Sequence, residues 1–494
     1  MLGLSNFASR EIDRKMIQEV GLPGLVLMEE AALRIYDILK DNYALEGKNV
    51  LIAAGKGNNG GDGLALARIL FNRNIKVRVL LSHETGFSAE ALIQLEVIKK
   101  MGVLIEVFTE SSKSIFREAD IIIDALLGTG FQGELGPVFK EMVKMINNSE
   151  AIKVAIDIPT GFNGDSGTEN LYIQNTHTIA LGYLKPAHLL TDKINRLDLV
   201  KLEFASSLEK EVSALESFNY YLEEEAGNRL PVRNKDTHKG SYGKIGVLGG
   251  CHNMAGAAIL SGLGALKTGS GLVTLWLESL EDLPLRPPEL MLESWNKALN
   301  KELDVLILGP GLGLDLKLDL ETILKGFQGT VLIDADGLNL LAQGKINREW
   351  ISGDLILTPH PKEMERLLGS YGDRRESVYA LAERYKATVI LKGWRTLISD
   401  GDRLWINLTG NPGMGTPGSG DVLSGVIASL KGQGLKTIDS VVLGVYLHGL
   451  SGDLAAREIG EASLLASDIA AFIPVGIKKI KEAVRINRDI IRIY

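Results

Sequence analysis

A glycine-rich run that leads directly into an amphipathic helix constrains this chain more than any other stretch. Residues 411–425 read Asn-Pro-Gly-Met-Gly-Thr-Pro-Gly-Ser-Gly-Asp-Val-Leu-Ser-Gly, and apolar residues then recur with helical spacing from Val422 to Leu430. Gly432 and Gly434 would end this helix. A glycine-rich loop at a helix N-terminus points unpaired backbone N–H groups and the positive end of the helix dipole at one spot. The pattern therefore predicts a phosphate site.

Asp421 lies inside this predicted anion site, where a carboxylate would repel a bound phosphate. The simpler interpretation is that Asp421 only caps the helix. Capping explains neither the glycine density nor the length of the run. We therefore predict that Asp421 is a base that works beside a phosphate.

Composition bounds the class of protein. The length of 494 residues predicts two to three domains, and 45% hydrophobic with 23% charged residues describes a soluble globular protein. A formal net charge of -8 without a basic stripe argues against a nucleic-acid partner. The single Cys251 excludes an intrachain disulfide and suits a reducing cytoplasm. We expect no export signal and no membrane span.

The first half alternates apolar runs of strand length with helical patterns, which predicts a parallel sheet covered on both faces. The segment from Ser5 to Lys40 is expected to be helical, with a break at residues 21–24, and another helix is expected at residues 64–72. The expected strands are residues 49–54, 77–81, 104–108, 121–124, 153–156 and 178–181.

A mixed polar stretch near residues 208–235 separates the halves, and all five tryptophans lie beyond it. The predicted organisation is a domain at 1–206, a linker at 207–234 and a larger α/β domain at 235–494. Expected strands of the second domain are residues 244–248, 272–276, 305–308, 331–333, 355–357, 389–391 and 404–407.

Polar motifs in the first half follow the predicted strands. Residues 55–60 fit G-x-G-x-x-G, with Glu84 downstream, which alone would suggest a dehydrogenase. However, Asp62 would repel a pyrophosphate there. Asp124 and Asp157 end later strands, where each is either a turn former or a functional group. The hard oxygens of Asn59, Asp124 and Thr160 could share one cation, and Asp157 could then act as a general acid or base.

In the second half, His360 lies between two prolines at a strand end, as a turn residue or a ligand-binding one. Residues 392–396 could deliver a cation and backbone amides to a nucleotide. We predict structural roles for Asp334 and Asp336, because Asp-rich turns after strands are common. Trp276 and Trp295 are assigned to packing.

Three segments of the first half, residues 58–63, 124–130 and 157–161, resemble the loops of the NAD(P)HX epimerase family, which has a Rossmann-like fold. Members interconvert the R and S forms of hydrated NADH and NADPH at C6 of the nicotinamide ring. The resemblance implies a potassium ion held by Asn59, Asp124 and Thr160, with Asp157 at the reacting ring. Implied substrate contacts are Asn58, Asn59, Gly60, Gly61, Asp62, Gly128, Thr129, Gly130, Phe131 and Asp157.

This half departs from the family pattern at two places. Residues 27–32 read Leu-Met-Glu-Glu-Ala-Ala, where an Asn-Ala-Gly ending is usual, so that Glu30 and Ala32 differ. Thr160 stands where serine is commoner, which is a chemically mild change. The first departure concerns either a pocket wall or a subunit contact.

The second half resembles the ribokinase-like superfamily, and within it the NAD(P)HX dehydratases. The resemblance rests on Thr358-Pro359-His360-Pro361-x-Glu363, the 411–425 run, and residues 256–258 and 448–453. It implies ADP or ATP as phosphoryl donor and a magnesium ion that Glu363 contacts through water. Implied hydrate contacts are Ala257, Gly311, His360 and Asp421. Implied nucleotide contacts are Lys392, Gly393, Trp394, Arg395, Thr396, Asn411, Gly413, Gly415, Thr416, Gly418, Ser419 and Gly420.

Both halves in this order resemble the bifunctional NAD(P)H-hydrate repair enzymes, and we expect a cytoplasmic homo-oligomer acting on NADHX and NADPHX. In the expected reaction, Asp421 takes the proton of the C6 hydroxyl as it attacks the nucleotide, and phosphate then leaves. Two alternatives stay open at this point. The second half could be a kinase of a small vitamin alcohol, and the first half a binding or scaffolding module without catalysis.

Overall fold

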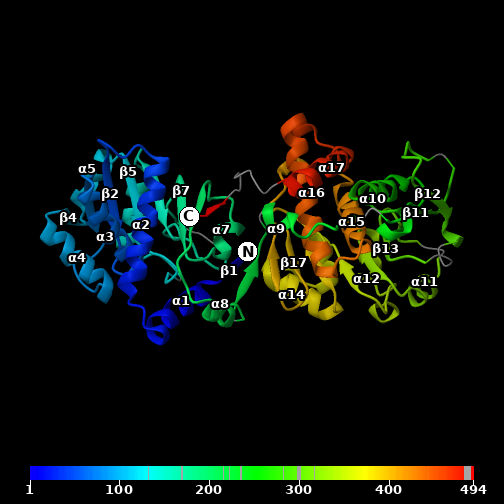
Figure 1. The fold of residues 1–494 in the computed structure, drawn as a ribbon, viewed down its shortest axis with the longest axis horizontal. Helices are drawn as coiled ribbons and strands as arrows, with labels where there is room; N and C mark the ends of the chain where they lie inside the picture. The colour runs from blue at the N-terminus through cyan, green and yellow to red at the C-terminus, as the bar shows by residue number, and fades with distance from the viewer. Residues whose placement is uncertain are drawn as a thin grey trace. The chain divides into compact units, whose positions relative to one another are not determined.

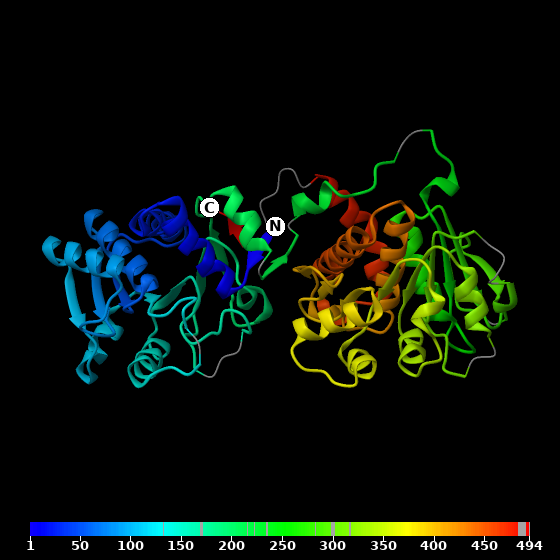
Figure 2. The same cartoon turned by 90° about the horizontal axis from the view of Figure 1, so that it is seen from below.

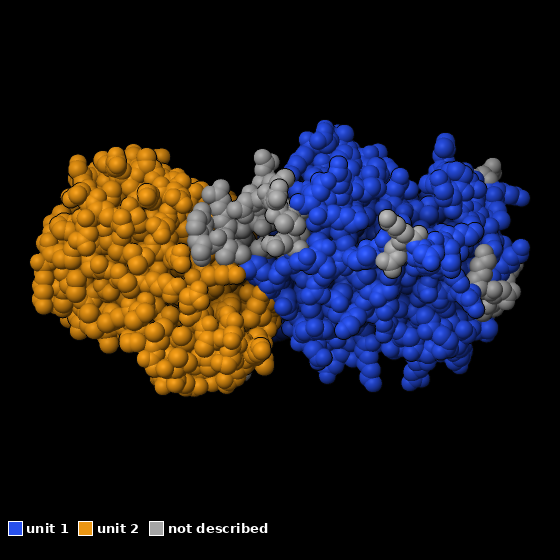
Figure 3. Space-filling view, in the orientation of Figure 1, with its two compact units in different colours: residues 1, 219–486 blue, residues 2–218, 487–494 orange. Residues whose placement is uncertain are grey.

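A computed structural model describes residues 1–131, 133–167, 171–214, 216–221, 223–233, 236–281, 283–297, 302–315, 318–482 and 491–493. Its contacts divide the chain into two compact units, coloured separately in Figure 3. The N-terminal unit comprises residues 2–218 and 487–494, and the C-terminal unit comprises residues 1 and 219–486. The domain limits at residues 206 and 235 stay a prediction.

The N-terminal unit contains an all-parallel sheet in the order β19-β8-β7-β6-β5-β2-β3-β4 (Figure 1). The six strands predicted from the sequence are confirmed within one residue, whereas β8 and β19 were not predicted. The strands are β2 (Asn49–Ala54), β3 (Lys76–Leu81), β4 (Leu104–Val107), β5 (Ile121–Ala125), β6 (Ile152–Ile156), β7 (His177–Leu181), β8 (Leu197–Val200) and β19 (Ile491–Ile493).

Both faces of this sheet are buried, which explains the continuous apolar runs. Val50, Ile52 and Ala54 of β2 belong to one hydrophobic cluster, whereas Leu51 and Ala53 belong to another. Successive side chains of a strand point to opposite faces, so each residue of such a run enters a core. The flanking helices are α1 (Asn6–Lys15), α2 (Gly24–Asn42), α3 (Asn58–Asn72), α4 (Ala89–Met101), α5 (Lys113–Glu118), α6 (Pro137–Asn147), α7 (Pro186–Leu190) and α8 (Ser206–Ser213).

Helix α3 begins six residues before its predicted start, because the glycines of residues 58–63 serve close packing and not a loop. Gly57 is extended, with φ -88° and ψ -171°, and the helix follows it directly. A Cβ on Gly60 would lie 2.0 Å from the Gly55 carbonyl oxygen, and one on Gly61 would lie 2.4 Å from Met28 Cε. The predicted helix start at Leu64 was therefore wrong, and Asn58 and Asn59 occupy the first helical turn.

The C-terminal unit contains a mixed sheet in which β18-β17-β16-β15-β14-β13-β10-β11-β12 are neighbours in that order, and Asn219 at the end of β9 pairs with Trp405 of β18. The pairs β16–β17 and β17–β18 are antiparallel, and the other pairs among these strands are parallel. Seven strands are confirmed within one residue: β10 (Lys244–Leu248), β11 (Leu272–Leu277), β13 (Val305–Leu308), β14 (Thr330–Ile333), β15 (Leu355–Leu357), β16 (Thr388–Leu391) and β18 (Leu404–Ile406). The sequence did not predict β9 (Ser217–Asn219), β12 (Met291–Ser294) and β17 (Leu397–Ser399).

Helices α10 (Ala255–Thr268), α15 (Ser419–Gly432), α16 (Thr437–Ile459) and α17 (Ala466–Glu482) pack together in this unit (Figures 1 and 2). Helix α15 is the predicted helix after the glycine-rich run, and its apolar residues join one core with β10 and β13. It lies unusually close to α10, because a Cβ on Gly425 would be only 1.9 Å from the Ser261 carbonyl oxygen. This contact holds the middle of α15 against α10.

The structure confirms the predicted fold class of two α/β units, each built on its own sheet. Across the described part of the chain, no helix is long and apolar enough to cross a membrane.

Candidate active sites

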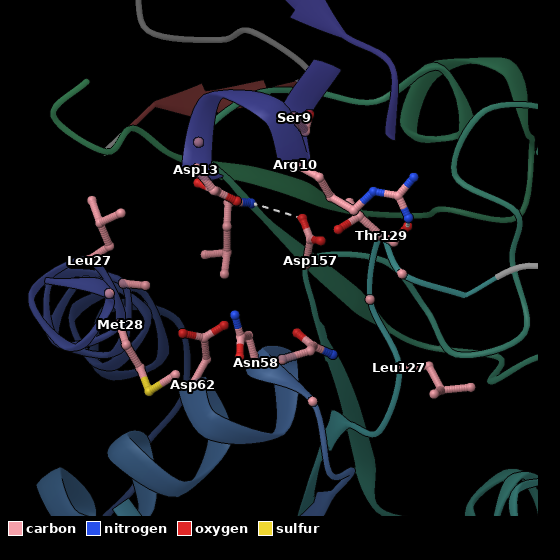
Figure 4. Close-up of a pocket in the computed structure, with 18 of the residues that line it drawn as sticks. Ser9, Arg10, Asp13, Leu27, Met28, Asn58, Asp62, Leu127, Thr129 and Asp157 are labelled. Atoms are coloured by element: carbon pink, nitrogen blue, oxygen red, sulfur yellow. Dashed lines mark hydrogen bonds between the residues drawn. The ribbon is translucent and has the colours of Figure 1, made fainter. Parts of the chain in front are cut away.

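A cavity of about 910 Å³ opens at the ends of strands β5, β6 and β7 in the N-terminal unit (Figure 4). Eight of the predicted substrate contacts line it, whereas Gly60 and Gly61 lie in the α3 packing described above. The eight are Asn58, Asn59, Asp62, Gly128, Thr129, Gly130, Phe131 and Asp157. Residues predicted from three separate segments of the sequence therefore line one cavity.

Among the predicted cation ligands, Asn59 lines this cavity, whereas Asp124 at the end of β5 and Thr160 after β6 contact each other. Asp124 and Thr160 are each 1% exposed, and Thr160 donates to Asp124 through its hydroxyl at 2.7 Å and its backbone N–H at 2.8 Å. Burial raises the pKa of Asp124 to about 6 against these hydrogen bonds. Both amide atoms of Asn59 are buried without a hydrogen-bond partner among the described residues. An unsatisfied buried amide oxygen is the kind of donor that a hard cation takes up.

Asp157 is held in an unusual backbone conformation, with φ +64°. Its Oδ1 accepts from Lys185 Nζ at 2.6 Å, and its carbonyl oxygen lies 2.6 Å from His188 Nε2. Its other carboxylate oxygen would be 3.4 Å from a Cβ at Gly128, where glycine leaves the space above Asp157 and Asn59 open. Strained backbone at a ligand site is common where the surrounding structure over-determines it.

His188 and Lys185 were not predicted as site residues, and they position Asp157 from helix α7. His188 Nδ1 accepts from the Lys185 backbone N–H at 3.0 Å, so the neutral ring carries its proton on Nε2 and donates to Asp157. Burial and the Lys185 charge lower the pKa of His188 to about 4, which keeps the ring neutral. The signal available in the sequence was a lysine just beyond strand β7, at the sheet edge where ligands bind.

The carboxyls of Asp62, on α3, and of Asp13, on α1, also line the cavity. Burial, with the charges of Asp157 and Asp13, raises the pKa of Asp62 well above its ordinary value. Burial also raises the pKa of Asp13 to about 7, opposed by Lys185 and reinforced by Asp157. Asp13 stays open to cavity solvent although protein surrounds it. No pattern in the sequence indicated Asp13, which is far from every motif.

The departures from the family pattern in α2 do not reach the cavity. Ala32 is fully buried in the core, and Glu30 lines a separate groove on the outer side of α2. Leu27 and Met28 of the same segment line the cavity as apolar wall. The change at Glu30 therefore concerns the surface of this unit.

In the C-terminal unit, Asp421 occupies the first turn of α15, directly after the glycine-rich run. Gly418, with φ +89°, is the residue before the helix, a conformation that favours glycine. Burial and the charge of Asp334 raise the pKa of Asp421 to about 7, against the charge of Lys392. A general base with that pKa is half ionised near neutral pH.

Asp334 belongs to the Asp421 cluster, and not only to the turn that the sequence suggested. It is 1% exposed, with Oδ1 accepting from Lys392 Nζ and Oδ2 from Ser424 Oγ, each at 2.7 Å. Burial raises the pKa of Asp334, but Lys392 and Ser424 outweigh it and leave the value below the ordinary one. A Cβ on Gly420 would lie 3.3 Å from Lys392 Nζ, so this lysine lies at the N-terminus of α15.

Glu363 and His360 extend the cluster through helix α13 (Pro361–Leu368). Glu363 Oε2 accepts from the His360 backbone N–H at 2.8 Å and lies 4.0 Å from Lys392 Nζ. His360 Nδ1 accepts in turn from the backbone of Lys362 and Glu363, so His360 caps the helix. Its half-exposed ring leaves a role in ligand contact as a prediction. Gly311 and Ala257 lie together, because a Cβ on Gly311 would be 3.3 Å from Ala257 Cβ.

The predicted nucleotide loop is fastened to helix α16. Asp453 accepts from the Gly410 backbone N–H and from Asn411 Nδ2, each at 2.9 Å. Arg395 donates to the Leu408 carbonyl at 2.8 Å and has φ +51°, while Trp394 beside it is 47% exposed. The predicted nucleotide contacts of this region stay a prediction: Gly393, Trp394, Arg395, Thr396, Asn411, Gly413, Gly415, Thr416 and Ser419.

Comparison with known proteins supplies two family matches. Residues 245–475 match the family described as NAD(P)H-hydrate dehydratase. Residues 24–187 match the family described as YjeF-related protein N-terminus. Among solved structures, an ADP/ATP-dependent NAD(P)H-hydrate dehydratase from Bacillus subtilis, co-crystallised with ATP and Mg²⁺, is 28% identical. It covers 53% of this chain and 99% of its own, with a TM-score of 0.46.

Full-length relatives carry both matches in one chain. The bifunctional NAD(P)H-hydrate repair enzyme of Moorella thermoacetica is 36% identical, covering 96% of this chain and 96% of its own length. The protein of the same name from Escherichia coli is 34% identical over 93% of this chain and 91% of its own. With this identity over almost the whole length, the chain belongs to the family of bifunctional NAD(P)H-hydrate repair enzymes.

Proposed function

We propose that the chain repairs hydrated NADH and NADPH in two steps. The N-terminal unit interconverts the R and S epimers at C6, and the C-terminal unit dehydrates the S epimer at the expense of ADP or ATP. The observation that carries the proposal is Asp421, a carboxyl with its pKa near 7, at the N-terminus of a helix that follows a glycine-rich loop. A base and an anion site side by side are what phosphoryl transfer to a hydroxyl needs.

In the second step, Asp421 accepts the proton of the C6 hydroxyl while the oxygen attacks the terminal phosphoryl of the nucleotide. The backbone N–H groups at residues 418–420 and the helix dipole stabilise the charge on the transferred group. Lys392 adds a positive charge beside Gly420, and its contact with Asp334 keeps its ammonium group in place. Phosphate then leaves with the electrons of the C6–O bond while the lone pair of the ring nitrogen assists, and loss of a proton from C5 forms the C5=C6 double bond of the restored nicotinamide ring.

We propose that the second step uses a nucleotide and a magnesium ion, on the basis of a relative and of the carboxyl group of Glu363. The Bacillus subtilis protein is named ADP/ATP-dependent and was crystallised with ATP and Mg²⁺. Glu363, whose pKa burial raises above its ordinary value, would hold magnesium through water in this chain. Bound magnesium would neutralise charge on the phosphates. We expect ADP to be the preferred donor.

In the first step, Asp157 contacts the reacting ring, while Asn59, Asp124 and Thr160 would hold a potassium ion. The unpartnered Asn59 amide and the remaining lone pairs of Asp124 suit such an ion. Bound potassium would supply a positive charge at this site. The proposal also includes a cytoplasmic location and a homo-oligomeric state. Light scattering of the purified chain would check the oligomeric state.

The test of the second site is Asp421→Asn, which keeps the size of the side chain and removes the base. With pure S-NADHX and ADP, we expect the restored nicotinamide absorbance to appear at least about 100-fold more slowly, a usual effect of losing a general base. Asp402→Asn, at an exposed turn, is the matched control. Wild-type turnover by Asp421→Asn would refute the assignment, and reactions with ADP, ATP or neither identify the donor.

The test of the first site is Asp157→Ala. This variant should still repair the S hydrate. After the rate of spontaneous epimerisation is subtracted, it should not convert the R hydrate. Unchanged turnover of pure R-NADHX would contradict the division of labour between the two units.

A further inference from the structure

Helix α1 closes one wall of the cavity in the N-terminal unit, although it precedes residues 24–187 that the family match covers. Figure 4 shows Asp13 of α1, Asp157 after β6 and Asp62 of α3 directed toward the same space from three sides. The α1 residues that line the cavity are Ser9, Arg10, Ile12, Asp13 and Arg14.

The backbone that carries Asp13 is firmly docked. Ala8 and Ile12 on the inner face of α1 are at most 1% exposed. Ser5 caps the helix by accepting from the Ala8 backbone N–H at 3.1 Å, and Asp165 accepts from the Asn6 backbone N–H at 2.7 Å. Asp13 is therefore presented to the cavity from a fixed position, as a proton-transfer group must be.

Lys185 links Asp13 electrostatically to the site already described. Its ammonium group is bonded to Asp157 Oδ1 at 2.6 Å and to the Leu181 carbonyl at 2.8 Å, and it attracts Asp13 as well. The negative charge of Asp157 repels that of Asp13. Two carboxyls that share one cation do not favour a second negative charge, so one of them tends to keep a proton.

We propose that Asp13 is a second catalytic residue of the epimerase. It donates a proton to the ring nitrogen, whereas Asp157 accepts the proton of the C6 hydroxyl. The proposal rests on the epimerase function proposed above. At C6 the substrate carries both a hydroxyl and the ring nitrogen N1, so exchange of configuration needs one group that takes a proton and another that gives one.

The step balances without any further reactant. Asp157 accepts the hydroxyl proton, the O–H pair forms the C6=O double bond, and the C6–N1 bond breaks. Its electrons go to N1, which takes the proton of Asp13. The product is an open-chain aldehyde, and rotation about C5–C6 turns its other face toward N1. N1 then attacks C6, its proton returns to Asp13, and the oxygen recovers the proton from Asp157.

Proton exchange at Asp13 is set by its surroundings. The surrounding protein raises the pKa of Asp13 to about 7 although solvent reaches its side chain, so both of its forms are present at neutral pH. Because ring opening needs the protonated form, the epimerisation rate should fall as pH rises above about 7. The titratable and charged groups around this part of the cavity are Arg10, Arg14, Asp62, Asp157, Tyr183, Lys185 and Glu209.

The experiment uses the full chain with ADP and Mg²⁺ and compares pure R-NADHX with pure S-NADHX. Asp13→Asn should lower the rate from the R epimer by about 100-fold, with the rate from the S epimer unchanged. The residual rate of Asp13→Asn should no longer fall as pH rises above about 7. Asp13→Glu should restore part of the rate and part of this alkaline fall. Asp41→Asn, at an exposed position of α2, should behave as wild type.

The outcomes separate the inference from the function that it rests on. If Asp13→Asn converts the R epimer within about two-fold of wild type, or keeps the alkaline fall, Asp13 is not the proton donor. Should Asp13→Asn fail to fold, the position of the alkaline fall in Asp13→Glu decides, because an unmoved profile overturns the proposal. A wild-type chain that never converts the R epimer would instead refute the epimerase function.

Discussion

Lys392→Met tests whether the buried ion pair with Asp334 supports the C-terminal unit. The substitution keeps most of the aliphatic stem but leaves the carboxylate, which is 1% exposed, without its cation. Removing one partner of a buried pair costs about 3–5 kcal/mol. Ser424 Oγ at 2.7 Å and the Ala335 N–H at 2.9 Å continue to donate to Asp334. We therefore expect the lower end, about 3 kcal/mol.

Differential scanning calorimetry of the full chain measures this loss. For a domain of this size, about 1 kcal/mol shifts Tm by roughly 2–4 °C, so the C-terminal transition should fall by about 6–12 °C. The double variant Asp334→Asn/Lys392→Met should recover most of the shift, because no unpaired charge remains. Lys362→Met, at an exposed position of α13, is the control and should leave Tm unchanged.

The direction of the Asp334 pKa shift predicts how the stability loss of Lys392→Met varies with pH. The pKa of Asp334 is lowered in the folded chain from its ordinary value of 3.8, so its stabilisation is present above 3.8 and is lost as pH falls through the folded value. The gap between wild type and Lys392→Met should accordingly be widest near neutral pH and narrow in acid. A Lys392→Met chain that melts with the Lys362→Met control at pH 7 would refute the reasoning.

Three further outcomes are expected. Dehydration of S-NADHX should slow as pH falls below about 7, because burial raises the pKa of the base Asp421 to that value; a flat kcat/KM profile would contradict its role. Gly60→Ala should lower the Tm of the N-terminal unit, because its Cβ would lie 2.0 Å from the Gly55 carbonyl, whereas Gly57→Ala, with open space, should not. Asn59→Leu should abolish any activation of epimerisation by potassium over choline chloride, and retained activation would place the ion elsewhere.

The fold could be predicted where strands enter a core on both faces, as in β2 and β10, because every residue after the first one is buried and none of these is polar. Strands β12 and β17 escaped prediction for physical reasons. Strand β12 (Met291–Ser294) lies at the sheet edge and is half polar, and β17 (Leu397–Ser399) contains only two apolar residues before its serine. The start of α3 was misplaced because glycines that permit close packing resemble glycines that form a loop.

The site residues likewise fall into those that the sequence could predict and those that it could not. Those in compact motifs, such as Asn59, Asp157 and Asp421, could be proposed from spacing alone. The role of Asp334 could not, because an aspartate after a strand looks the same whether it ends a turn or binds a buried lysine. Asp13 could not be proposed either, since only the docking of α1 brings it to Asp157.

Both sites use the same electrostatic arrangement, and this has a consequence for repair as a whole. In each unit one lysine binds one carboxylate, Lys185 with Asp157 and Lys392 with Asp334, at 2.6 and 2.7 Å. A second carboxyl close by has its pKa raised to about 7, and the two second carboxyls are proposed to act in opposite forms. Asp421 must be ionised to accept a proton, whereas Asp13 must be protonated to donate one. Flux from the R hydrate should therefore peak near neutral pH, while flux from the S hydrate should only level off as pH rises.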